Sequence, residues 1–305
     1  MRPIKLLIYC SILFILFSCK EDFFDSVTEV PLPEHEPQLS IGATINASFP
    51  QTAIVRVSST LSILDTSDFQ PVTDAQVMLY EEDDLNAVFR DEHNAGWYTS
   101  EEALELTSGK SYTLKIDSPT FGSIEATQIL PEEVEILSAS YQSDNAIDIY
   151  GERVDEVIIE FNDPKDEENY YIVSVLAAYP FENEDTSFVL ETLVYDSPVD
   201  PILEQLPSGL FFNDVSFEGE NYRLRVGIEL REAISYNEIV SGPPEKLTIN
   251  LTTINKDFYL FQKTFDAFWE NEGNPFAEPV IIHENIEGGA GLFSLMITNE
   301  FSIDL

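Results

Sequence analysis

Nucleophilic catalysis needs a serine, threonine or cysteine that a nearby base activates, and the base is most often a histidine. The chain has three histidines, His35, His93 and His283, and two cysteines, Cys10 and Cys19. It contains neither a G-x-S-x-G nucleophile elbow nor an H-E-x-x-H zinc helix. We therefore predict no catalytic residue, no metal site and no cofactor.

Carboxylates are the abundant reactive groups, with 56 acidic against 15 basic residues and a net charge of −41. Two carboxylates that flank a glycosidic bond can hydrolyse it. Among so many, however, every spacing occurs by chance, so a carboxylate-based hydrolase remains only an alternative. Residues 144–148 come nearest to a calcium loop but lack its glycine and its downstream glutamate. The charge repels phosphates, which excludes a nucleic-acid partner.

The N-terminus has the layout of a signal peptide. Arg2 and Lys5 precede an apolar run at residues 6–17, which is about half the length of the roughly 20 residues that span a bilayer. Residues 1–18 are therefore predicted to be cleaved. Two alternatives stay open, namely an uncleaved anchor and secretion with a free Cys19.

The residues that close this run, Leu-Phe-Ser-Cys at 16–19, resemble the lipobox of bacterial lipoprotein precursors, although Phe17 replaces the usual small residue. The resemblance implies that Cys19 is acylated and anchors the protein in outer-membrane lipid. No cysteine is left in the mature chain to pair with Cys19. More than one acyl chain makes such an anchor stable.

The residues after the anchor resemble the export signal that places Bacteroidota lipoproteins on the outer face of the outer membrane. They are Lys20, Glu21 and Asp22. Residues 19–37, with three prolines and no periodicity, are predicted to be a tether. We thus expect a lipid-anchored protein that faces the cell exterior.

Alternating apolar residues predict a mainly β fold with two β-sandwich domains, at residues 38–131 and 132–305. The first domain contains P-V-T-D-A-Q-V-M-L-Y at 71–80, G-W-Y-T-S at 96–100 and L-T-S-G-K-S-Y-T-L-K-I at 106–116. This order resembles the carboxypeptidase-regulatory, transthyretin-like sandwich, which implies a structural or binding module. In the second domain, residues 195–217 are rich in Pro, Asp and Ser and are predicted to be irregular.

One amphipathic helix is predicted near residues 255–271, because aromatic residues recur there at three- and four-residue steps. We expect its aromatic face to pack on the second sandwich. A helix that binds a partner or lies on a membrane is the alternative.

Three glycines at 288, 289 and 291 follow the helix. Gly288, Gly289 and Gly291 permit a tight turn or a close backbone approach, and a structural turn is favoured over a ligand cradle. The F-x-E-P motif at 276–279 and the N-I-x-G-G-x-G-x-F motif at 285–293 resemble the closing signature of the Bacteroidota domain-of-unknown-function 4249 family. The resemblance implies an outer-membrane lipoprotein and an association with TonB-dependent transporters.

These features predict a non-catalytic binding or accessory component that partners a TonB-dependent transporter in nutrient uptake. Besides the hydrolase, the alternative is a free-standing adhesin module that binds glycan or protein.

Overall fold

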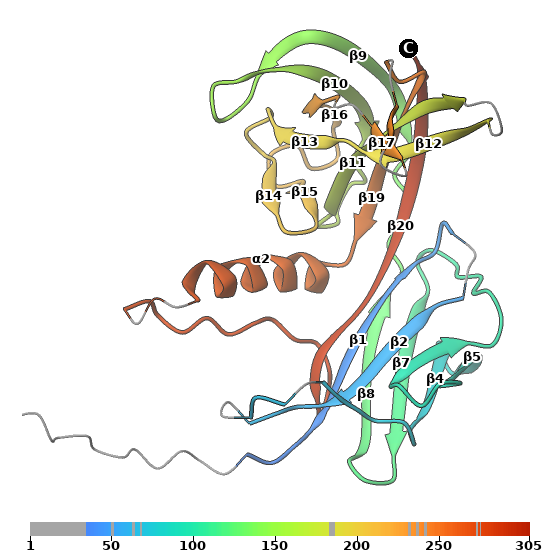
Figure 1. Cartoon of the computed structure of the whole chain (residues 1–305). Helices are drawn as coiled ribbons and strands as arrows, with labels where there is room; N and C mark the ends of the chain where they lie inside the picture. Colours follow the sequence, from blue (N-terminus) through green and yellow to red (C-terminus); the bar gives the residue numbers. More distant parts are fainter. Residues whose placement is uncertain are drawn as a thin grey trace, which may run out of the picture. The chain divides into compact units, whose positions relative to one another are not determined.

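Strands dominate the computed structural model (Figure 1), which describes residues 35–305 except 50–51, 63–64, 68, 183–186, 231–232, 236–237, 241–242, 273 and 275. The prediction of a mainly β fold with one late helix is confirmed. In the described part of the chain, that helix, α2, spans Lys256–Asn271. Residues 37–305 form one compact structural unit.

The first eight strands precede residue 131. They are β1 (Leu39–Asn46), β2 (Ile54–Ser59), β3 (Gln70–Pro71), β4 (Gln76–Glu81), β5 (Asp84–Arg90), β6 (Trp97–Ser100), β7 (Ser111–Ser118) and β8 (Gly122–Ile129). Side chains alternate across a strand, so in β7 the buried apolar side chains are Tyr112, Leu114 and Ile116. Such inward rows form the N-terminal core.

Among the described residues, twelve further strands follow. They are β9 (Ile136–Ile147), β10 (Arg153–Asn162), β11 (Tyr170–Glu182), β12 (Ser187–Leu193), β13 (Tyr195–Pro198), β14 (Glu204–Leu206), β15 (Gly209–Asn213), β16 (Asn221–Glu229), β17 (Ala233–Ser235), β18 (Glu238–Val240), β19 (Lys246–Ile254) and β20 (Ala290–Asp304). The sheet β13-β16-β10-β9 and strands β11 and β19 contribute to a second core. The irregular structure predicted for residues 195–217 is wrong, because β13, β14 and β15 lie there. Their apolar residues Leu210, Phe211 and Phe212 are buried despite the polar composition around them.

The last strand joins the two halves of the fold. Residues 290–296 of β20 pair in parallel with β1, and residues 296–304 pair antiparallel with β19. One 14-stranded sheet therefore runs through both halves. The side chains of Phe293 and Leu295 pack in the N-terminal core, although the sequence division at residue 131 assigns them to the second domain.

The helix α2 follows β19 directly and packs through its first turns. Phe258 and Tyr259 are buried in a third apolar cluster with Tyr170 of β11 and Phe211 of β15. The ring centroids of Tyr170 and Tyr259 are 4.9 Å apart, a geometry that contributes about 0.5–1.5 kcal/mol beyond burial. The expected packing of the helix on the second sandwich thus holds for its N-terminal half.

Candidate functional site

The three predicted glycines lie where β20 begins beside β1. Gly288 and Gly291 have positive φ values of 83° and 108°, which side chains with a Cβ rarely adopt. A Cβ on Gly291 would overlap the carbonyl oxygen of Ile41, and one on Gly289 would lie 2.7 Å from the carbonyl oxygen of Leu39. These glycines therefore allow the close approach that starts the parallel pairing.

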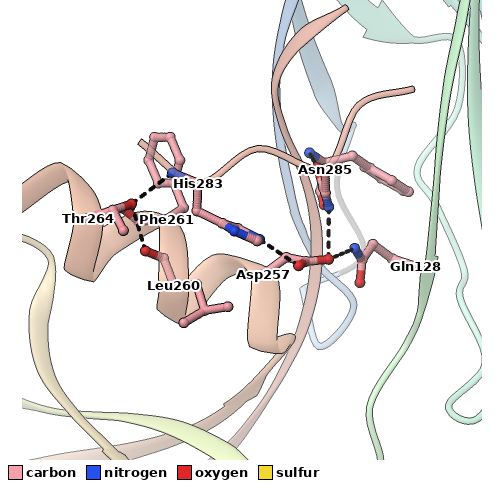
Figure 2. Close-up of polar contacts among 8 residues, drawn as sticks. Gln128, Asp257, Leu260, Phe261, Thr264, His283 and Asn285 are labelled. Carbon is pink, nitrogen blue, oxygen red and sulfur yellow. Dashed lines mark hydrogen bonds and ion pairs between the residues drawn. The ribbon is translucent and has the colours of Figure 1, made fainter. Parts of the chain in front are cut away.

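A polar cluster forms just before this turn, around Asp257 in the first turn of α2 (Figure 2). His283 Nε2 lies 2.7 Å from Asp257 Oδ1. Gln128 of β8 donates to Asp257 Oδ2 at 2.6 Å, and Asn285 donates to the same oxygen at 3.3 Å. We call these four residues the Asp257 cluster. They come from β8, α2 and the segment between α2 and β20, so the cluster connects both halves of the fold.

The carboxylate of Asp257 is held in its ionised form. Partial burial disfavours the charge, but hydrogen bonds from His283, Gln128 and Asn285 outweigh that effect and lower the pKa of Asp257 below its ordinary value. Asp257 therefore acts as a fixed anionic acceptor at neutral pH, and its hydrogen-bond donors are fixed with it.

Residues 276–289, which we call the return segment, run back along the helix from its C-terminal end toward β20 (Figure 1). The backbone N–H of His283 donates to Thr264 Oγ1 at 2.8 Å, while the Thr264 hydroxyl donates to the helix carbonyl of Leu260. Asn285 donates to the carbonyl of Phe293 and accepts from its N–H. These contacts fix the His283 end of the return segment against α2.

The Asp257–His283 pair resembles two members of a hydrolytic triad in composition. A triad also needs a hydroxyl or thiol hydrogen-bonded to the other imidazole nitrogen, and no such bond occurs among the described residues. The Thr264 hydroxyl, which contacts the backbone of His283, accepts from that backbone N–H and donates to a helix carbonyl. The described geometry supports positioning of the return segment and supplies no nucleophile.

Beyond these fixed contacts, large apolar side chains are exposed. The stripe predicted on the helix continues as Phe265 and Trp269, whose rings meet edge to face, but it leaves the core. Phe268 and Trp269 are 42% and 52% exposed, and Phe276 and Ile281 are 94% and 88% exposed. We call Phe268, Trp269, Phe276 and Ile281 the apolar end of the helix unit. The prediction that the whole aromatic face packs on the sandwich is therefore wrong for its C-terminal half.

A separate cavity of about 520 Å³ lies over β5 and the loop after β6, and three glutamates line it. Glu101, Glu102 and Glu105 all belong to the loop between β6 and β7, and Glu101 pairs with Arg90. A glycoside hydrolase places its two carboxyl groups on opposite sides of the scissile bond. The three glutamates here lie together on one loop and so do not form such a facing pair.

The predicted anchor and export signal, Cys19 with Lys20, Glu21 and Asp22, lie outside the described residues. Within residues 35–305, apart from the gaps given above, no group of three His, Cys, Asp or Glu is placed to hold a metal ion. In the nearest approach to a calcium loop, Asp148 instead accepts from the N–H groups of Tyr150 and Glu152. No helix in the described part of the chain has the length and hydropathy that crossing a bilayer requires.

Sequence reasoning missed three members of the Asp257 cluster. Asp257 is one of 56 acidic residues, and Gln128 lies 129 positions away from it, so no local pattern marks either. Asn285 lies inside the N-I-x-G-G motif and was the one detectable signal.

Comparison with solved structures finds a beta-glucuronidase from glycoside hydrolase family 2, at 13% identity and a TM-score of 0.22. That match covers 71% of this chain and 19% of the enzyme's chain. No curated protein matches the sequence. The family described as "Domain of unknown function (DUF4249)" matches residues 26–301. Since that match takes in nearly the whole chain, including the 14-stranded and four-stranded sheets, α2 and the glycine turn, the protein belongs to the DUF4249 family.

Proposed function

We propose that the protein is a lipid-anchored lipoprotein on the outer face of the bacterial outer membrane. In this proposal it is a non-catalytic binding component that partners a TonB-dependent transporter in nutrient uptake. The observation that carries the binding role is the apolar end of the helix unit. Within it, the half-exposed rings of Phe268 and Trp269 are in contact, with centroids 6.1 Å apart. Soluble proteins rarely leave contiguous large apolar side chains in water unless a partner covers them.

The anchoring part of the proposal rests on the N-terminal sequence, with Cys19 as the acylated residue. The transporter partner rests on the resemblance that the closing motifs carry. Both are consistent with a strongly acidic chain, since such a charge keeps a protein dissolved at the cell surface and away from anionic head groups.

The non-catalytic part is supported by the two arrangements of reactive groups described above. The imidazole of His283 is hydrogen-bonded to Asp257, while the Thr264 hydroxyl contacts only the backbone N–H of His283 and a helix carbonyl. The glutamates of the 520 Å³ cavity come from one loop. In neither arrangement do an acid and a base, or a nucleophile and a base, face each other across a cleft that could hold a substrate.

Purification of the full-length protein from its own membranes in mild detergent tests the proposal. We expect a β-barrel transporter to be recovered with it in a constant ratio. Recovery of the lipoprotein alone, at a detergent concentration that keeps other outer-membrane complexes intact, would contradict the accessory role.

A glycan-binding module is the second candidate, and one observation favours it. Trp269 is half exposed and lies one residue from Glu270, and an aromatic face beside carboxylates suits stacking and hydrogen bonding to a sugar. Calorimetric titration with soluble polysaccharides decides this candidate. Binding that disappears in Trp269→Ala but persists in Tyr150→Ala would favour glycan recognition.

A further inference from the structure

We infer that the apolar end of the helix unit is a docking surface for a protein whose apolar pocket is bordered by lysine and arginine side chains. This inference rests on the proposed accessory function and names its surface and the chemistry of its partner.

The first argument is the size and exposure of the side chains. Phe276 and Ile281 are almost fully exposed, and Phe268 and Trp269 are about half exposed. Aromatic anchors of this kind dominate binding energy when a partner's pocket covers them. Burying apolar surface is the main favourable term in association.

The second argument is that the described structure holds this surface in place before any partner arrives. The Asp257 cluster and Thr264 fix one end of the return segment. At its other end, the Asn274 side chain accepts from the N–H of Phe276, and the Asn274 carbonyl accepts from the N–H of Ala277. Because these contacts order the two ends of the return segment beforehand, less of the contact energy is spent on ordering those ends when a partner binds.

The third argument is charge, and it selects the occupant. Residues 264–285 contain no lysine and no arginine, and the one histidine there, His283, is paired with Asp257. The segment carries five carboxylates, at Asp266, Glu270, Glu272, Glu278 and Glu284. Opposite charges around an apolar contact speed association and reject wrong partners.

The same charge disfavours the other occupants. A second copy of this chain would bring a net charge of the same sign, because the full sequence carries −41. Helices that lie on a membrane surface present Lys and Arg on their polar face, whereas this one presents carboxylates. A basic protein surface is the occupant that fits.

Site-specific photo-crosslinking in living cells tests the inference with the full-length, lipid-anchored protein. Trp269 and, in a second variant, Phe276 are replaced by p-benzoylphenylalanine. Tyr150 is the matched control, since it is an exposed aromatic residue (69%) in the β9–β10 turn, outside the docking surface. Both docking positions are exposed, so neither replacement disturbs the core.

We expect one protein to be crosslinked at positions 269 and 276 and at least tenfold less at 150. Mass spectrometry of the crosslinked peptide should place Lys or Arg within a few residues of the attachment point. Crosslinks to a second copy, to lipid, or to a peptide without basic residues would overturn the inference. So would equal yields at all three positions or no crosslink at 269 and 276.

The same experiment separates this inference from the proposed function. A transporter crosslinked at 150 but not at 269 or 276 would sink the docking surface and leave the accessory role. A basic partner that is captured at 269 and 276 but is not a transporter would keep the docking surface and overturn the accessory role.

Discussion

His283 Nε2 lies 2.7 Å from Asp257 Oδ1, and this contact joins the first turn of α2 to a residue of the return segment that lies 26 positions later in the chain. A carboxylate paired with an imidazole is also found in catalytic dyads, but the contacts around this pair hold the return segment against α2. Gln128 and Asn285 donate hydrogen bonds to the other carboxylate oxygen, Oδ2. Asp257 thus accepts from three side chains, and these contacts account for its position without a bound substrate.

Removal of the Asp257 carboxylate should loosen the return segment. We expect Asp257→Ala to lower the free energy of unfolding by about 1–3 kcal/mol, because three donors lose their common acceptor. Hydrogen exchange at residues 276–289 should accelerate, while exchange in β7 stays unchanged. Glu270→Ala, an exposed position on the same helix, is the control.

The pH dependence of that effect follows from the lowered pKa of Asp257. A lowered pKa gives stability that is present above the unfolded value of about 3.9 and is lost as the pH falls through the folded value. Denaturation curves of the wild-type protein and Asp257→Ala should therefore converge below about pH 4. A difference that grows with acidification would contradict the assignment.

The glycine turn gives a second prediction with an internal control. Gly291→Ala should destabilise the protein by more than about 1 kcal/mol, since it combines positive φ with overlap on the Ile41 backbone. Gly42 pairs with Leu292 on the neighbouring strand, and no heavy atom lies within 4 Å of the position that a Cβ would take there. Gly42→Ala should be neutral or slightly stabilising in thermal unfolding. If Gly291→Ala and Gly42→Ala changed the stability equally, the close approach to the Ile41 backbone would not be what requires a glycine at position 291.

A partly buried acid on β13, Asp196, gives a pH prediction of opposite sign. Asp196 accepts from the N–H of Val175, and burial raises its pKa to about 8. Its Oδ1 is buried and has no hydrogen-bond partner among the described residues. The folded state thus holds an extra proton between about pH 4, the unfolded value, and pH 8, and stability falls as the pH rises through that window.

Asp196→Asn removes this dependence without changing the shape of the side chain. The free energy of unfolding of the variant, minus that of the wild type, should rise by about 1–3 kcal/mol when the pH is raised from 4.5 to 8.5. Urea denaturation at both pH values measures the gain, with Asp266→Asn on α2 as the control. A wild-type-minus-variant difference that is flat with pH would show that Asp196 is ionised in the folded protein.

The anchor is tested by fractionation. We expect Cys19→Ala to leave residues 38–305 folded, as judged by circular dichroism and thermal unfolding, and to move the protein from the membrane to the soluble fraction. Loss of incorporated radioactive palmitate should accompany the release. A variant that stays in the membrane with Met1 intact would mean that an uncleaved helix is the anchor.

Much of this fold could be predicted because its signals are local. Alternation along β7 and the aromatic spacing of α2 depend on residues a few positions apart, so one sequence is enough to show them. The glycines at 288, 289 and 291 were also visible, because their conformational freedom is a property of the residue type.

The remainder depends on contacts between distant parts of the chain. No local pattern shows that β20 pairs with β1 from 250 residues earlier, or that Gln128 reaches Asp257. The exposed half of α2 was mispredicted for a related reason. Aromatic periodicity identifies an apolar face, but only the tertiary structure shows that the core ends before Phe268.

Quantitative co-purification tests the central claim most directly. Full-length wild-type protein, the double variant Trp269→Ala/Phe276→Ala and the control Tyr150→Ala are purified from their own membranes in the same mild detergent, and the recovered transporter is measured per lipoprotein. The account predicts equal recovery for the wild type and the control, and at least a tenfold loss for the double variant with unchanged thermal unfolding. Undiminished recovery with the double variant would contradict it.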